Sequence, residues 1–362
     1  MTLRTEALLT SRVGFGIVTA TPAQRAAARI IDGLPLGELR DHPDVIALVG
    51  GSGARDQLHT ERGSLPLEVV FLASIRSAKT IIAAAAAIRM TQSIDCSRLG
   101  PGEIPRVSLL SLRLDQSAVA HRLLLETIRA SPVLSKLLVA DTADSLTVRH
   151  PSGRPIEIAC VAGAKTGGTL VARWSAGLVA DEAPRMAGAD DAVVNLEHAR
   201  SAILGRLLPG AQALYIGSPW APYGPVYELV QEHWQKPRED LVVLRGTGPM
   251  LNPLWWTPER CRKLEAQDPT AYCCDVLGEF ADPESGLLSP ISLRANTRER
   301  PLELPPISGA FYVAAIDPSE GSATSNGFAL LVVEHLKDPD DEQEKWSRVV
   351  DRDSDQAATF AS

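Results

Sequence analysis

Six short apolar runs recur through the first 245 residues, and stretches with helical periodicity separate several of them. The stretch Gln116–Arg129 places Ala120, Leu123, Leu124 and Ile128 on one helical face, whereas Lys79–Met90 is rich in alanine. Strands that are apolar on both faces and alternate with helices are typical of a mostly parallel sheet covered by helices. The sequence therefore predicts an α/β fold with strands at Leu67–Ala73, Val107–Leu112, Ile156–Val161, Ala176–Ala180, Ala211–Ile216 and Leu241–Leu244.

The chain changes character beyond residue 282. Residues Pro283–Pro306 are rich in proline, serine and other polar residues, a composition typical of a linker. Ala310–Ile316 and Phe328–Val333 follow as two predicted strands, and the acidic stretch Asp338–Asp355 is expected to be a solvated loop or a frayed end. We therefore expect a first domain at residues 1–282, a linker at residues 283–308 and an incomplete second domain at residues 309–362.

Composition and charge narrow the class of protein. Hydrophobic residues make up 45% of the chain, enough for a sizeable core, but the longest apolar run, Ile81–Ile88, is far too short to span a membrane. The first ten residues lack the features of a signal peptide, so we expect a soluble, cytoplasmic protein without membrane contact. The net charge is −8, of which −5 lies between Glu334 and Asp355. Because the rest of the chain is nearly neutral, contact with nucleic acid would need a local basic surface.

The segment after the first predicted strand has the parts of a phosphate-binding loop. A short loop leads to Lys79 and Thr80, which open the alanine-rich helix. In such loops the backbone N–H groups and the lysine bind phosphates, and the hydroxyl binds Mg²⁺. The two usual glycines are replaced by Ala73 and Ala78. Taken alone, the segment therefore fits the first turn of an ordinary helix better than a nucleotide site.

Two further segments follow predicted strands. The run Ser175–Ala180 ends in Asp181 and Glu182, which is the arrangement in which one carboxylate holds Mg²⁺ and the next polarises an attacking water. An acidic strand end that merely reaches solvent is the alternative, but together with Lys79 the pair favours a nucleotide site. The turn Gly217–Pro219 ends the next strand. Such a turn senses the γ-phosphate in many DNA-driven ATPases, although Gly-Ser-Pro is also simply a good turn.

The order and spacing of these motifs resemble the large terminase subunit of tailed double-stranded DNA bacteriophages, the motor that packages the genome. The resemblance spans roughly residues 20 to 333 and implies a P-loop NTPase of the ASCE type, followed by the start of an RNase H-like nuclease. The segments that carry it are Arg76–Thr80, Val107–Ala118, Asp181–Ala183, Gly217–Pro219 and Leu277–Phe280.

The resemblance implies a role for each motif residue in binding and hydrolysing ATP. Glu182 would orient the attacking water, and Arg76 would reach the γ-phosphate. Thr80 and Asp181 would position Mg²⁺, and the turn of Gly217, Ser218 and Pro219 would couple hydrolysis to motion. The residues implied to bind ATP are Gln24, Arg76, Ser77, Ala78, Lys79 and Thr80.

Two of the implied roles have equally plain alternatives. Gln24 would contact adenine, but it also stands three residues after Thr21, where it would cap a helix that begins at Pro22. Arg173 is a weak candidate for an arginine finger presented to a neighbouring subunit, and a surface arginine is the favoured interpretation.

The second predicted domain begins with one acidic residue of interest. The segment Val313–Gly321 resembles the first strand of the family's nuclease, in which Asp317 would bind Mg²⁺ or Mn²⁺. A strand-end turn residue is the alternative. Two-metal cleavage needs several converging carboxylates, and in the family the partners of Asp317 come from later strands, so we expect nuclease activity to be lost in this chain.

These observations predict an ATP-driven motor that moves double-stranded DNA into phage procapsids. The resemblance implies double-stranded DNA, a small terminase subunit, a portal protein and further copies of the chain in a homo-oligomeric ring as partners, in the host cell cytoplasm. A helicase-like DNA-dependent ATPase is one alternative. A prophage remnant that binds but no longer hydrolyses ATP is the other, because of the alanines at positions 73 and 78.

Overall fold

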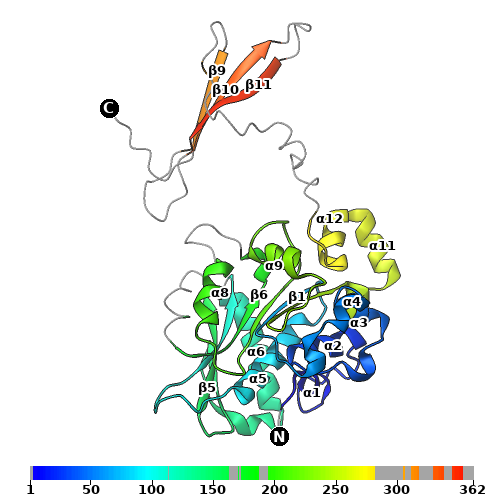
Figure 1. The fold of residues 1–362 in the computed structure, drawn as a ribbon, viewed down its shortest axis with the longest axis vertical. Coiled ribbons are helices and arrows are strands. Elements are labelled where there is room, and N and C mark those ends of the chain that lie inside the picture. Colours follow the sequence, from blue (N-terminus) through cyan, green and yellow to red (C-terminus); the bar gives the residue numbers. More distant parts are fainter. Residues whose placement is uncertain are drawn as a thin grey trace. The chain divides into compact units, whose positions relative to one another are not determined.

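The computed structural model describes residues 3–112, 114–162, 170, 173–186, 195–281, 305, 311–317, 329–337 and 345–353. The chain divides into two compact units near residue 285. The first contains an eight-stranded sheet with helices on both faces, and the second contains a three-stranded sheet (Figure 1).

The large sheet has the strand order β3-β4-β5-β2-β6-β7-β1-β8. From β5 to β8 across the sheet all neighbouring strands are parallel, whereas β3 and β4 form an antiparallel edge. All six predicted strands are confirmed, while β3 and β4 were not predicted. The bounds are β1 Glu68–Ala73, β2 Arg106–Ser111, β3 Leu138–Asp141, β4 Ser145–Arg149, β5 Pro155–Ala162, β6 Ser175–Asp181, β7 Ala213–Gly217 and β8 Leu241–Gly246.

Two hydrophobic clusters cover the two faces of this sheet. Successive residues of β1 belong to the two clusters in turn, for example Phe71 to one and Leu72 to the other. This alternation is expected for a strand that is buried on both faces. One cluster packs under α1 Thr5–Thr10, α2 Pro22–Ile31, α3 Pro43–Leu48, α5 Lys79–Ser93 and α6 Leu114–Ala130. The other packs under α8 Leu196–Leu204 and α9 Pro225–His233. The remaining α-helices are α4 Ser52–Asp56, α10 Gly248–Leu251, α11 Pro258–Gln267 and α12 Pro269–Ala271.

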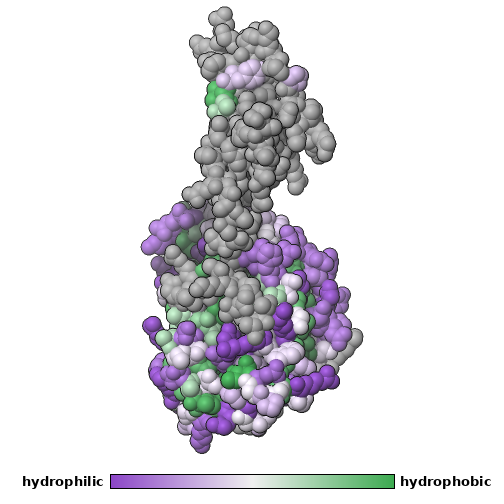
Figure 2. All heavy atoms as spheres, turned by 90° about the vertical axis from the view of Figure 1, so that its left-hand side faces the viewer, coloured by the Kyte–Doolittle hydropathy of each residue, from purple (hydrophilic) through white to green (hydrophobic). Residues whose placement is uncertain are grey.

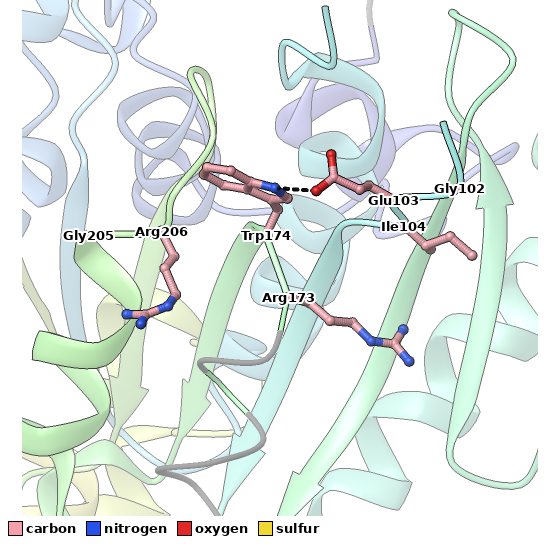
Figure 3. A pocket seen from close by; sticks show the side chains of 7 residues that line it. All are labelled: Gly102, Glu103, Ile104, Arg173, Trp174, Gly205 and Arg206. Carbon is pink, nitrogen blue, oxygen red and sulfur yellow. Dashed lines mark hydrogen bonds between the residues drawn. The ribbon is translucent and has the colours of Figure 1, made fainter. Parts of the chain in front are cut away.

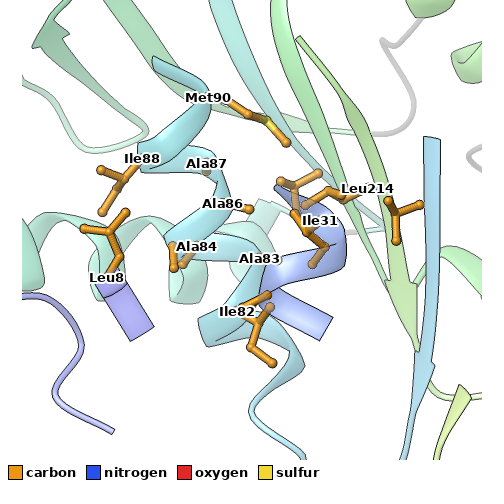
Figure 4. Close-up of a cluster of buried hydrophobic side chains, with 14 of the residues drawn as sticks. Leu8, Ile31, Ile82, Ala83, Ala84, Ala86, Ala87, Ile88, Met90 and Leu214 are labelled. Atoms are coloured by element: carbon orange, nitrogen blue, oxygen red, sulfur yellow. The ribbon is translucent and has the colours of Figure 1, made fainter. Parts of the chain in front are cut away.

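The alanine-rich helix α5 lies in the centre of the larger cluster. Its residues are buried from Ile82 to Thr91, and Figure 4 shows it between Leu8 of α1, Ile31 of α2 and Leu214 of β7. A helix buried on all sides needs small side chains where its neighbours approach closely, and alanine also has the highest helix propensity. Arg89 fixes its far end, since its guanidinium donates to Asp32 at 3.0 Å and to Gln212 at 2.8 Å.

The second unit holds an antiparallel sheet of β9 Phe311–Asp317, β10 Ala329–Lys337 and β11 Lys345–Asp353 in the order β11-β10-β9. The two predicted strands are confirmed. The expectation of a loop or frayed end after Asp338 was wrong over Lys345–Asp353, because these residues pair with β10. Charged residues are common on an edge strand, so the acidity of this stretch did not argue against a strand. The register places the backbone of Asp317 opposite Ala329 and that of Asp353 opposite Leu330, at one end of the sheet.

The surface of the first unit is mixed in character. On the face that Figure 2 shows, hydrophilic residues predominate and apolar residues are scattered among them. Within the described part of the chain, no helix combines the length and apolar character that crossing a membrane requires.

Candidate nucleotide-binding site

The three predicted motifs meet at the carboxyl edge of three adjacent parallel strands. β7 lies between β1 and β6, and the register pairs Leu72 with Gly217 and Asp181 with Ile216. The loop after β1, the acidic end of β6 and the turn after β7 therefore come together although they are far apart in sequence. This edge is where ligands bind in open parallel α/β sheets.

The loop between β1 and α5 keeps a strained backbone without glycine. Arg76 has a φ of 59° and Ala78 a φ of 67°. These values lie in the left-handed region, where a residue other than glycine is destabilised by roughly 1–2 kcal/mol. Ala78 therefore occupies a position that favours glycine, and the surrounding contacts must hold the loop in this shape.

Lys79 connects this loop to the turn after β7. It is the first residue of α5 and is buried, and its Nζ donates to Ser218 Oγ at 3.0 Å and to the Ser74 carbonyl at 3.4 Å. The Ser218 hydroxyl in turn donates to the carbonyl of Ala73 at 3.0 Å. Burial lowers the pKa of Lys79, and the nearby carboxylates of Glu182 and Asp181 act in the opposite direction.

Asp181 and Thr80 are the two predicted metal ligands of the first unit, and the structure places them side by side. The Thr80 side chain lies beside Asp181 in a small cavity, and its hydroxyl lowers the pKa of that carboxyl. Burial, followed by the negative charge of Glu182, raises the pKa of Asp181 to about 6, while Lys79 lowers it. A hydroxyl beside a carboxylate offers the oxygen donors that Mg²⁺ prefers, so these residues fit the expected metal.

Glu182 lies in the turn after β6, and the turn after β7 packs against it. Its φ is 57°, and its N–H donates to Asp181 Oδ1 at 3.0 Å. A Cβ atom added to Gly217 would lie 2.4 Å from Pro184 Cδ and 3.2 Å from Glu182 Cα. The turn after β7 therefore packs directly against the backbone that carries the catalytic candidate.

Two residues near Glu182 were not predicted. Arg185 Nε lies 3.7 Å from Glu182 Oε2, and its guanidinium stacks 3.9 Å from the centroid of the Trp220 ring. The Asp-Glu motif and the turn at Gly217 each lie only a few residues away, but nothing in the sequence indicates that these two side chains meet.

A cavity of about 480 Å³ lies beside the loop. Its lining combines the loop with polar and apolar side chains from other segments. The hydroxyls of Ser74 and Ser77 are buried without a hydrogen-bond partner among the described residues, and within the same part of the chain the N–H of Ala78 donates to no backbone carbonyl. Buried donors of this kind are satisfied by a phosphate, so the cavity fits a nucleotide. It is lined by Ile17, Thr19, Thr21, Gln24, the loop from Arg76 to Ile81, and Leu251–Leu254.

Gln24 takes part in this site through the loop. Its Oε1 accepts from the N–H of Thr21 at 3.0 Å, which completes a capping box, and its Nε2 donates to the carbonyl of Ser77 at 3.0 Å. The capping interpretation is thus confirmed. Contact with adenine stays a prediction, because both ends of the amide are engaged with protein here.

Arg76 is exposed at the mouth of the cavity. Its guanidinium lies 5.8 Å from the centroid of the Trp255 ring, on a segment that sequence reasoning did not connect with the loop. Asp317 belongs to the second unit, so its role as a metal ligand stays a prediction.

Arg173 lies at a different place in the fold. Arg173 precedes the amino end of β6, whereas Asp181 lies at the carboxyl end of this strand. Within one chain, Arg173 is therefore at the end of the sheet that lies away from the three motifs. It lines a second cavity of about 720 Å³ with Trp174 and Arg206 (Figure 3). Its guanidinium donates to Glu157 at 2.7 Å, and a role toward a neighbouring subunit stays a prediction.

Comparison with known proteins finds similar solved structures at low sequence identity. No family model matches the chain, and no curated protein matches it significantly. The large terminase of a thermophilic bacteriophage is 14% identical, with 74% of this chain and 60% of that one covered and a TM-score of 0.44. An arginine-to-alanine mutant of the ATPase domain of the Thermus phage P74-26 large terminase is 15% identical, with 66% and 98% covered and a TM-score of 0.47.

The large terminase of bacteriophage HK97 is 13% identical, with 82% of this chain and 65% of that one covered and a TM-score of 0.47. The chain thus spans less than two thirds of the thermophilic and HK97 structures. The thermophilic phage protein was also solved with ADP and with ATP-γ-S. The first unit is an α/β domain whose mostly parallel sheet and strand–loop–helix segment have the arrangement of a P-loop fold, and large terminases of bacteriophages are among the solved structures that it resembles.

Proposed function

We propose that this chain is the motor ATPase of a phage-type large terminase, which hydrolyses ATP to move double-stranded DNA into a procapsid. The observation that carries the proposal is the convergence of Lys79, the pair of Thr80 and Asp181, and Glu182 at one edge of the sheet. The order and spacing of the motifs in the sequence support the terminase type.

In this proposal the loop binds the phosphates of ATP, and the residues at the end of β6 act on Mg²⁺ and the attacking water. The N–H groups of the loop and the Nζ of Lys79 bind the phosphates of ATP. Thr80 would hold Mg²⁺ directly and Asp181 through water, and the ion supplies charge neutralisation at the phosphates. Glu182 orients the water that attacks the γ-phosphate in line, and Arg76 reaches the γ-phosphate from the mouth of the cavity.

Ser218 couples the state of the site to the rest of the domain. In this structure Lys79 donates to Ser218 Oγ at 3.0 Å. When Lys79 turns to a phosphate, Ser218 loses this partner, and the change is transmitted to the turn that packs against Glu182. The backbone after Pro219 then carries the motion toward DNA.

The remaining assignments belong to the same proposal. We assign the motor domain to residues 1–282, the linker to residues 283–308 and the start of an RNase H-like nuclease to residues 309–362, and the division near residue 285 supports these bounds. Asp317 would be a metal ligand of that nuclease. The partners are double-stranded DNA, a small terminase subunit, a portal protein and other copies of the chain in a ring, in the host cytoplasm.

ATP turnover with and without duplex DNA tests the proposed function. A DNA-dependent motor should hydrolyse ATP faster when long duplex DNA is present and should not separate the strands of a labelled duplex. Turnover accompanied by strand displacement would favour a helicase-like ATPase. Nucleotide binding without turnover under all DNA conditions would favour a non-hydrolysing remnant, an outcome that the alanines at positions 73 and 78 make worth testing.

A further inference from the structure

The phosphate loop is held from outside by the segment that follows β8. The N–H of Ser74 donates to the carbonyl of Gly246 at 3.1 Å, and the N–H of Ile75 donates to that of Asp275 at 2.9 Å. Two side chains of the same segment donate hydrogen bonds to carbonyl groups of the loop. Trp256 Nε1 donates to the Ile75 carbonyl at 3.0 Å, and Asn252 Nδ2 donates to the Arg76 carbonyl at 2.7 Å.

These two side-chain bonds act on the strained part of the loop. Arg76 itself has a left-handed φ of 59°, and Ala78 follows with 67°. A residue other than glycine leaves this region readily unless its neighbours restrain it. The bond from Asn252 ends on the carbonyl of Arg76, so it restrains the peptide group that leads into Ser77.

Both donors are themselves fixed. Trp256 is buried, and its indole packs against Gly248, where an added Cβ atom would lie 2.5 Å from the ring Cδ1. Asn252 Oδ1 accepts from the N–H of Trp255 at 3.3 Å, which orients its amide toward the loop. With the carbonyls of Ile75 and Arg76 tied to these donors, the N–H groups of Ser77 and Ala78 donate to no carbonyl in the described part of the chain.

We propose that Asn252 and Trp256 are positioning residues that hold the phosphate loop in its anion-binding shape, in place of the glycine that the chain lacks at position 78. We call these two residues the clamp. The proposal rests on the proposed function, because it concerns how the same site binds ATP. The clamp acts through the loop, since its hydrogen bonds end on backbone oxygens.

Equilibrium binding of ATP-γ-S tests the clamp. Asn252→Ala and Trp256→Phe each remove one donor to the loop, and each should weaken binding about fivefold to tenfold. Thr257→Ala is the matched control, because the Thr257 hydroxyl accepts from the N–H of Arg260 in the same segment and makes no bond to the loop. The control should bind within about twofold of the wild type. Clamp variants that bind as tightly as the control would overturn the proposal.

The substitution Ala78→Gly, combined with Asn252→Ala, distinguishes a positioning role of Asn252 from a general loss of stability. Ala78→Gly relieves the steric cost of the left-handed φ, so it should recover at least about threefold of the affinity that Asn252→Ala loses. In the wild-type background the same substitution should change the affinity by a smaller factor, because the bond from Asn252 already restrains the loop there. An equal effect of Ala78→Gly in both backgrounds would contradict a role through the loop.

Hydrogen–deuterium exchange of the nucleotide-free protein tests the clamp independently of ATP. The amides of Ser74 and Ile75 should exchange faster in Asn252→Ala than in Thr257→Ala, while both variants keep the wild-type melting temperature within a few degrees. Unchanged exchange would overturn the proposal. If the wild type bound no nucleotide, the proposed function would fail and the exchange comparison would still decide on the clamp.

Discussion

Gly217→Ala should impair catalysis by displacing the backbone of Glu182. The new Cβ atom would lie 2.4 Å from Pro184 Cδ, whereas carbon atoms in contact are about 3.5 Å apart, so the two segments must separate by about 1 Å. Pro184 is part of a rigid ring, two residues after Glu182, and cannot rotate away. A misplacement of about 1 Å costs about 100-fold in rate, and overpacking of this kind destabilises the fold by about 1–3 kcal/mol.

Steady-state ATPase assays of Gly217→Ala should therefore show kcat reduced about 100-fold. The KM for ATP should change little, because the cavity beside the loop contains no atom of Gly217. Gly205→Ala is the matched control, since its added Cβ atom would meet nothing within 4 Å and its φ is −71°. Thermal melts of both variants would show whether the domain stays folded. A kcat within twofold of the wild type in a folded Gly217→Ala protein would refute the reasoning.

Two further predictions concern the carboxylates. Asp181 has a pKa of about 6 instead of 3.8, so the folded state binds an extra proton between these values and loses about 3 kcal/mol of stability as the pH rises through this window. Asp181→Asn should therefore resist urea better than the wild type at pH 7.5 without Mg²⁺. The gain should vanish below pH 4, and its absence at pH 7.5 would contradict the assignment. We also expect this chain to leave supercoiled plasmid intact with Mg²⁺ or Mn²⁺, because two-metal cleavage needs several converging carboxylates and no group of three or more potential metal ligands lies among the described residues. Nicking that disappears in Asp317→Ala would show this expectation to be wrong.

The strands and the order of the motifs could be predicted because they depend on local patterns. The predicted strand Leu67–Ala73 is buried from Glu68 to Ala73, and Asp181 is the last residue of its strand. Parallel pairing then places the carboxyl ends of these strands together without further information.

The contacts that shape the site depend on residues distant in sequence. The lysine of the first motif bonds to Ser218 of the third, and Asn252 reaches the loop across 176 positions. No local pattern encodes such a pair, so the sequence alone does not indicate that Asn252 and Trp256 bond to a loop in which alanines replace the usual glycines. Strand β11 was not predicted because its local sequence is rich in charged residues, which is typical of a loop, although these residues pair with β10.

The central claim is that Lys79 binds the nucleotide and Glu182 activates the attacking water. Parallel measurements of ATP affinity and turnover in Lys79→Ala and Glu182→Gln test it most directly. Lys79→Ala should weaken binding by at least about tenfold, because it removes a charge-assisted contact to phosphate. Glu182→Gln should bind ATP nearly as well as the wild type but turn it over at least about 100-fold more slowly, because the amide cannot orient and polarise water as a carboxylate does. Hydrolysis by Glu182→Gln at the wild-type rate would contradict the account.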